Sequence, residues 1–129
     1  MYRAVSYPIT IVELETYTAD ADRIFDGESH DRLKEILAFN PEHGELIEGT
    51  GGVRQFIWQI GDGNSDEVQV VYFFHTLENP LFLLAVCEDF DDGEFDEQFC
   101  AQLLKLTAQL MAEYQRQREA LLKSIKTSA

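Results

Sequence analysis

Residues 40–58, NPEHGELIEGTGGVRQFIW, decide how this chain folds. Asn40 precedes a proline, and the residue before a proline is disfavoured in helical conformation, so a helix arriving from the N-terminal side should end here. The glycine-rich run GTGG (49–52) favours a tight turn with positive φ. The run VRQFIWQI (53–60) is rich in β-branched and aromatic residues, which predicts a strand. We therefore expect a helix, a glycine turn and a strand in succession.

The region before this stretch is predicted to hold one strand and then helical structure. Residues 7–14 (YPITIVEL) are short and β-branched, with the alternation typical of an opening strand. Helical spacing follows in residues 19–25 (ADADRIF) and again in 29–39 (SHDRLKEILAF), where Ser29 is the expected N-cap. The pattern favours a helical hairpin or one bent helix.

The region after this stretch contains two more strands and a long helix. Residues 68–76 (VQVVYFFHT) and 81–88 (LFLLAVCE) are apolar runs separated by turn-like sequence, which complete an antiparallel meander. From Asp96 onward apolar residues recur at steps of three, four or seven, which indicates one long helix. We predict a single α+β domain over residues 1–129, with an antiparallel sheet of about four strands, a helical pair and a long C-terminal helix.

The charge of the chain restricts its partners. It has 24 acidic and 10 basic residues, a formal net charge of −14, and residues 55–104 contain eleven Asp or Glu but no Lys or Arg. Such a surface repels phosphate backbones and anionic membranes, so neither direct nucleic-acid binding nor membrane association is expected. An acidic face that only keeps the protein soluble is one interpretation, and a face that recognises a basic protein is the other.

No targeting segment, metal site or cofactor is expected. The first twenty residues lack a basic start followed by a long apolar run, which favours a cytoplasmic location. Cys87 and Cys100 form no CxxC pair and are expected to be buried free thiols. Together with His75 they lack any recognised zinc-ligand spacing, and the acidic run at 88–97 does not fit the calcium-loop pattern.

From residue 11 to residue 96 the order of elements and the sequence resemble the RelE/HigB superfamily, the toxin components of bacterial toxin–antitoxin modules. Members carry the pattern NP..G..I.GTGG.R between the second helix and the sheet, and the strands VQVVYF and LFLLA extend the resemblance. The resemblance implies a RelE/HigB-like fold. The positions that match the pattern are Asn40, Pro41, Gly44, Ile47, Gly49, Thr50, Gly51, Gly52 and Arg54.

The resemblance also implies an activity, namely ribosome-dependent mRNA cleavage, or gyrase poisoning in fold relatives, held silent by an antitoxin. Metal-free RNA cleavage needs a base, an acid and cations that stabilise the phosphate. Arg54 and Tyr72 match the family motif, and His75 is the nearest candidate for a general base. The alternative is structural: Arg54 pairs with an acid, Tyr72 packs in the sheet and His75 caps a strand end.

The chain departs from the family where relatives carry cations. Each lost phosphate contact lowers RNA affinity, and the loss of one donor commonly costs ~10²-fold in rate. We therefore predict a RelE/HigB-like protein that does not cleave RNA, with a toxin component acting as a ribosome-dependent mRNA interferase as the alternative. The substituted positions are Gln55, Ile57, Asp62, Asn64, Ser65, Gln69 and Glu88.

The predicted function is an acidic protein-binding module, an inhibitor or regulator that mimics nucleic acid toward a basic partner. That partner would be a nucleic-acid-binding protein, a toxin or an antitoxin. The predicted contact residues are Trp58, Glu88, Asp89, Phe90, Asp91 and Asp92. The end of the last helix carries an apolar stripe long enough to pack against a second copy in a homodimer, formed by Tyr114, Leu121, Leu122 and Ile125.

Overall fold

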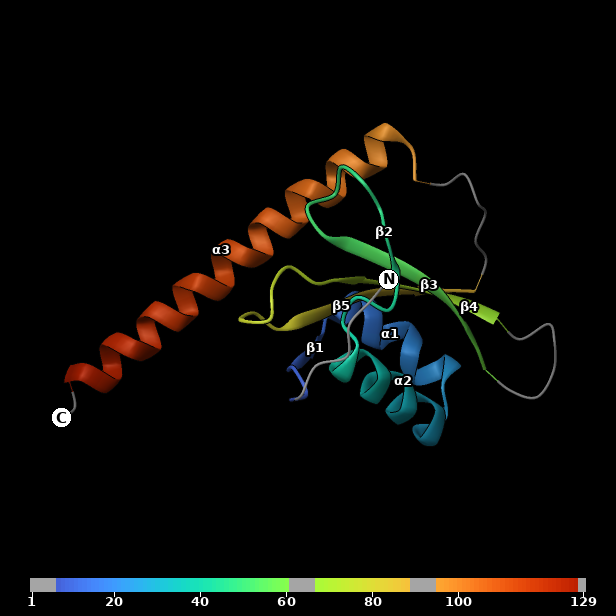
Figure 1. Cartoon of the computed structure of the whole chain (residues 1–129), viewed down its shortest axis with the longest axis horizontal. Helices are drawn as coiled ribbons and strands as arrows, with labels where there is room; N and C mark the ends of the chain where they lie inside the picture. The colour runs from blue at the N-terminus through green and yellow to red at the C-terminus, as the bar shows by residue number, and fades with distance from the viewer. Residues whose placement is uncertain (1–6, 61–66, 89–94, 128–129) are drawn as a thin grey trace.

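The structure is a computed structural model that describes residues 7–60, 67–88 and 95–127 (Figure 1). Within these residues the chain forms an α+β fold of three helices and one five-stranded sheet. The elements in chain order are β1 (Ile11–Glu13), α1 (Glu15–Ile24), α2 (Gly27–Phe39), β2 (Glu45–Leu46), β3 (Val53–Gln59), β4 (Glu67–Phe73), β5 (Leu81–Cys87) and α3 (Glu97–Thr127).

The strands lie in the order β1-β5-β4-β3-β2. The predicted antiparallel meander is confirmed for β3, β4 and β5. The prediction was wrong at both edges of the sheet. At one edge β1 pairs in parallel with β5. This is possible because β1 is not joined to β5 by a hairpin: two helices and the other strands lie between them in the chain. At the other edge β2 is only two residues long, and both are exposed, so no alternation could reveal it.

The predicted helical pair is confirmed as two separate helices, with different boundaries. α1 begins at Glu15, upstream of the predicted start. The N-cap of α2 is Asp26 rather than Ser29, because the Asp26 carboxylate accepts a hydrogen bond from the Ser29 backbone N–H at 2.7 Å. Asn40 ends α2 as expected, and both its backbone N–H and its side-chain amide donate to the Ile36 carbonyl oxygen.

The sheet separates two apolar clusters, because alternate residues of β4 and β5 face opposite sides. The helices α1 and α2 cover one face and α3 covers the other (Figure 1). Both strands are therefore buried on both faces along most of their length. The α1–α2 cluster includes Tyr17, Leu33, Leu37, Val70, Tyr72 and Leu83, and the α3 cluster includes Val53, Val71, Phe73, Phe82, Leu84 and Leu103.

The glycine turn joins the sheet to α3. Positive φ is confirmed at all three expected glycines, with values of 80, 80 and 126 degrees at Gly49, Gly51 and Gly52. Thr50, within the turn, is fully buried, and the hydroxyl of Thr107 on α3 donates to its carbonyl oxygen at 3.1 Å. A Cβ on Gly51 would lie only 2.9 Å from that hydroxyl, so the close approach of α3 also needs a glycine.

Only the first half of α3 packs on the sheet. Leu103 and Thr107 are buried and Tyr114 is partly buried, whereas every residue from 115 to 127 is exposed. This second half projects beyond the sheet (Figure 1). Among the described helices, none combines the length and apolar character needed to cross a membrane.

Alanine substitutions of three glycines should rank by backbone strain. Gly52→Ala should destabilise most, because its φ is 126 degrees and a Cβ would lie 2.8 Å from the Phe74 carbonyl oxygen. Gly49→Ala has open space and should lose only about 1 kcal/mol, the cost of a left-handed residue. Gly27→Ala, with neither problem, should be neutral or slightly stabilising. Urea denaturation measures all three, and a Gly52→Ala protein as stable as the parent would contradict the ranking.

Candidate functional site

Arg54 and Tyr72, the two predicted catalytic residues that match the family motif, are brought together. Arg54 on β3 and Tyr72 on β4 are directly opposed in the antiparallel register, so their side chains share one face of the sheet. Tyr72 belongs to the cluster under α1 and α2, which identifies that face. Both residues contact the loop at 40–44, which connects α2 to β2.

The Tyr72 hydroxyl is fully engaged in holding this loop. It donates to the Pro41 carbonyl oxygen at 2.8 Å and accepts from the Gly44 backbone N–H at 2.7 Å. The residue is fully buried, and this burial raises the pKa of Tyr72 to about 12. A phenol that keeps its proton at neutral pH and has both hydrogen bonds occupied is poorly suited to acid–base catalysis.

The Arg54 guanidinium is likewise occupied. One terminal nitrogen, Nη1, donates to the Gly44 carbonyl oxygen at 2.7 Å and to the Glu42 carbonyl oxygen at 3.4 Å. The other, Nη2, lies 3.6 Å from the Glu42 carboxylate, and the side chain is only 17% exposed. The buried Nε has no hydrogen-bond partner within the described part of the chain. The geometry therefore matches the structural alternative, in which Arg54 pairs with an acid.

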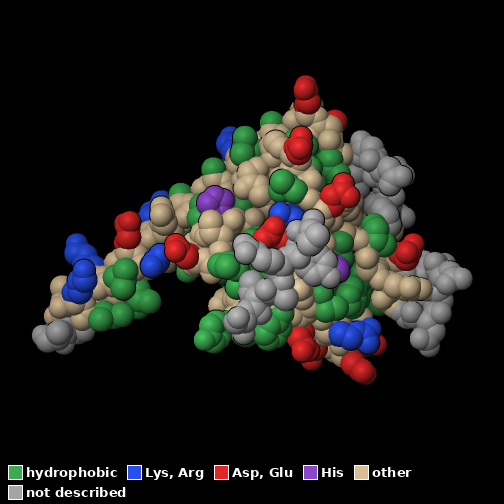
Figure 2. Space-filling model, in the orientation of Figure 1, with side chains coloured by type: hydrophobic (Ala, Val, Ile, Leu, Met, Phe, Trp, Pro, Cys, Tyr) green, Lys and Arg blue, Asp and Glu red, His purple; other side chains and the backbone are tan. Residues whose placement is uncertain are grey.

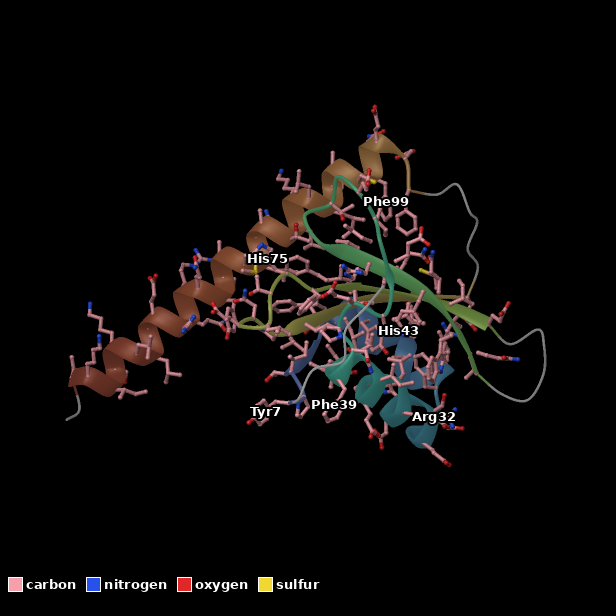
Figure 3. The ribbon with its side chains drawn as sticks, in the orientation of Figure 1. Tyr7, Arg32, Phe39, His43, His75 and Phe99 are labelled. Atoms are coloured by element: carbon pink, nitrogen blue, oxygen red, sulfur yellow. The ribbon has the colours of Figure 1, made fainter. Side chains whose placement is uncertain are left out.

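His75 does not join these residues. It follows the end of β4 and is exposed, and its ring lies 6.4 Å from that of Phe73, which belongs to the α3 cluster. Figure 3 shows the labelled His75 well apart from the labelled His43. The predicted acid–base group of Arg54, Tyr72 and His75 is therefore not assembled.

His43 is the histidine that the fold places in the loop held by Arg54 and Tyr72. Its ring meets Phe56 edge-on with centroids 5.0 Å apart. This contact arises only when the loop folds onto β3, so no sequence pattern reveals it. No cluster of three potential metal ligands occurs in the described segments. Cys87 and Cys100 are not joined in a disulfide, and both are partly exposed rather than buried as expected.

The spaced glycine–arginine motif acts as a packing unit around this loop. A Cβ on Gly44 would lie 2.8 Å from a Tyr72 ring carbon and 3.0 Å from the Gln55 carbonyl oxygen. Only glycine lets the loop approach the sheet this closely. The contacts of Pro41, Gly44, Arg54 and Tyr72 thus account for these motif positions without any chemical reaction.

A second polar cluster, which sequence reasoning missed, joins β1, α1 and α2. The fully buried Tyr17 has its hydroxyl 3.0 Å from His30 Nε2. The same nitrogen lies 3.7 Å from a Glu13 carboxylate oxygen, and Lys34 lies 3.3 Å from the other oxygen. The His30 ring stacks on Phe25 at 5.1 Å. Burial, followed by the nearby Lys34 charge, lowers the pKa of His30, so the fold favours the neutral imidazole.

The predicted partner-binding residues are split by the structure. Trp58 is partly buried; its indole N–H donates to the Ser29 hydroxyl at 3.3 Å and the Arg32 guanidinium lies 5.9 Å from its ring centroid. Glu88 is exposed and forms an ion pair with Arg23 at 2.8 Å. Each residue therefore ties a strand end to a helix end. The remaining four, Asp89, Phe90, Asp91 and Asp92, lie outside the described residues.

These two contacts define an acidic end of the molecule, where α1 ends, α2 begins, and β3 and β5 end beside the start of β4. Two cations, Arg23 and Arg32, lie among its seven described carboxylates, which leaves a formal excess of five negative charges. All but the first of these carboxylates belong to exposed residues: Asp20, Asp22, Asp26, Glu28, Asp31, Glu67 and Glu88.

Comparison with known proteins adds no assignment. No model of a known protein family matches the chain, and no curated protein sequence matches it at a significant level. The RelE/HigB relationship stays a prediction that rests on the spaced motif and the order of elements.

Removing the Tyr72 hydroxyl should destabilise the fold. Tyr72→Phe leaves the Pro41 carbonyl and the Gly44 N–H buried without their partner, so we expect a loss of about 2 kcal/mol or more in the free energy of unfolding. The matched control is Tyr7→Phe, whose side chain is 81% exposed and should change stability by less than about 0.5 kcal/mol. Equal stability of the two variants in urea denaturation would show that the hydroxyl does not hold the loop.

His30 should make the protein less stable in mild acid. Its folded pKa lies below the usual 6.5, so between these values the unfolded chain binds more protons than the folded one, and stability falls as pH decreases. His30→Gln should remove this part of the pH dependence, whereas His75→Gln, at an exposed position, should retain it. Urea denaturation at about pH 7.5 and about pH 5.5 provides the comparison. An unchanged pH dependence in His30→Gln would refute the assignment.

Proposed function

We propose that this protein is a non-catalytic binding module, an acidic inhibitor or regulator that recognises a basic protein partner. The observation that carries the proposal is the acidic end, where five elements of the fold converge and seven carboxylates meet two cations. Arg23 is already paired with Asp20 and Glu88, and Arg32 lies over Trp58. Most of the other carboxylates face solvent, where they can meet an incoming positive charge.

The contacts of the motif residues argue against the alternative of an mRNA interferase. Arg54 and Tyr72 bind the loop at 40–44 and are not offered to a substrate. On the α3 face, three positions that relatives fill with cations hold neutral groups. The Gln69 amide lies 3.4 Å from the Gln55 amide oxygen, and Ile57 is 43% exposed. Amides and an aliphatic side chain provide little stabilisation for the charge that develops on a cleaved phosphate.

The kind of partner follows from the charge. A protein with a net charge of −14 attracts basic surfaces over the Debye length, about 8 Å at physiological salt, and repels nucleic acid. Basic surfaces of proteins commonly serve to bind nucleic acid, so an acidic module that covers one would act as a mimic of that nucleic acid. A nucleic-acid-binding protein, a toxin and an antitoxin all fit this description.

Two triple variants with the same charge change test the acidic end. One lowers the formal excess at the acidic end from five negative charges to two through Glu28→Gln, Glu67→Gln and Glu88→Gln. The control carries Glu35→Gln, Glu48→Gln and Glu78→Gln at other exposed positions. Each immobilised protein is exposed to bacterial lysate at about 50 and about 300 mM salt, a range over which exposed charges are screened. We expect the parent and the control to retain basic proteins at low salt and the first triple variant to lose them. Equal retention by both variants would place the binding surface elsewhere.

Induction of this protein in a bacterium should neither arrest growth nor deplete mRNA. The reason is the loss of the phosphate-binding cations together with the structural engagement of Arg54. Growth curves and mRNA levels are compared with those of a strain that expresses Tyr7→Phe as a folded control and one that carries the empty vector. Rapid arrest with mRNA loss in the strain that makes soluble protein would favour the interferase.

A further inference from the structure

The projecting half of α3, residues 115–127, extends beyond the sheet and is not buried by it. All residues at 115–127 are exposed, including Leu121 at 61% and Leu122 at 46%. Isolated helices of fewer than about 12–15 residues are marginal in water. Figure 2 shows hydrophobic side chains along one edge of this projection and Lys and Arg side chains along the other. Such a segment gains stability when its apolar edge is covered.

The charge of this segment opposes that of the rest of the chain. Residues 115–127 hold four cations, Arg116, Arg118, Lys123 and Lys126, and one acid, Glu119, which gives +3. Because the whole chain carries −14, the remainder carries −17. Another copy of the same chain is therefore a partner of opposite charge that is certain to be present.

We propose that two copies dimerise through α3, with the helices antiparallel and the projecting half of each helix packed along the sheet-bound half of the other. Positions 101, 104, 108, 111, 115, 118, 122 and 125 are spaced alternately by three and four residues, the a and d positions of a heptad, and all of them except the partly buried Met111 are exposed. In an antiparallel pair whose two-fold axis passes between the helices at the level of Glu113, each of these positions faces another member of the set on the second copy. The pairs are Leu104 with Leu122, Ala101 with Ile125, Ala108 with Arg118, and Met111 with Gln115.

The residues that flank this seam also match across the two-fold axis. In the same register Lys105 faces Glu119 of the second copy, so the two form an intermolecular ion pair. Leu121 of the second copy falls beside Thr107, and Tyr114 falls close to its own equivalent. All four residues predicted from the sequence to mediate a dimer are thus placed at or beside the seam, although Tyr114 also packs on its own sheet.

Leu104 provides an exposed apolar contact on the sheet-bound half of α3. It is 49% exposed, at the flank of α3 beside the glycine turn, where a Cβ on Gly51 would lie 3.0 Å from it. The apolar edge of one projection therefore meets an apolar position on the other molecule. The contact from residue 101 to residue 125 repeats in both molecules and spans about 36 Å at ~1.5 Å per residue. The interface is isologous, so each copy uses the same surface and the dimer has no free surface of this kind to bind a third copy.

A second copy is a better partner for the projecting half of α3 than two alternatives. A basic amphipathic helix also fits an anionic membrane or a nucleic acid. Both would be repelled by the −17 on the remainder of this chain. A second copy instead offers Ala101 and Leu104 to the apolar edge of the projection, and the remainder of that copy carries the opposite net charge.

Sedimentation equilibrium of the full chain from about 1 to about 100 μM tests the dimer. We expect the parent to dimerise and Leu122→Asp to be monomeric, with the circular dichroism of the sheet preserved, since Leu122 lies in the projection and does not support the core. Ala120→Asp, on the opposite side of the same helical segment, should dimerise like the parent. A monomeric parent, or a Leu122→Asp dimer of parent strength, would overturn the proposal, and so would a monomer that binds vesicles containing phosphatidylserine or a DNA duplex through Leu122.

The antiparallel register is tested by charge reversal. Lys105→Glu and Glu119→Lys should each weaken dimerisation several-fold, because each places like charges together at both symmetric contacts, and the double variant should restore it. Lys123→Glu, away from the seam, changes the net charge as Lys105→Glu does and serves as the control. If the double variant were as weak as the sum of the single changes, the register would be wrong.

Discussion

The two hydrogen bonds of the Tyr72 hydroxyl are the constraint on which the rest of this structure depends. They hold the loop at 40–44 against β4, the central strand of the sheet. The Tyr72 side chain is buried there in the cluster under α1 and α2. That loop sets where α2 ends and where β2 joins the edge of the sheet, and Arg54 adds a second set of bonds to the same backbone. With Thr50 and Thr107 linking the next turn to α3, one short stretch connects the helical pair, the sheet and the long helix.

The features that the sequence predicts correctly are those whose controlling interaction is local. The glycine turn was predictable because positive φ depends on the residue itself, and the end of α2 because a proline restricts the residue before it. The cap at Asp26 was missed because Asp and Ser are both good N-caps, and only the geometry decides between them. The parallel pairing of β1 with β5 joins distant parts of the chain, and no local pattern encodes it.

The candidate site was predictable only in part for the same reason. The position of Arg54 beside Tyr72 follows from the hairpin register of β3 and β4, which the apolar runs indicated. The strand β4 ends at Phe73, so His75 lies beyond the paired residues and is not held beside Arg54 and Tyr72. The run VQVVYFFHT gives no sequence signal for that end. The engagement of the motif residues with backbone carbonyls, rather than with a substrate, likewise became visible only in the folded chain.

The parallel edge strand has a consequence for the order in which the protein can form during synthesis. Ile11 pairs with Leu81 and Glu13 with Leu83, so residues made early have partners that are made much later. The helices α1 and α2 contain local hydrogen bonds and can form as they emerge, and the β3–β4 hairpin can follow. The edge strand must wait until β5 has left the ribosome, and contacts between such distant residues slow folding. Its length of three residues limits how much unpaired backbone the nascent chain exposes to other chains in that interval.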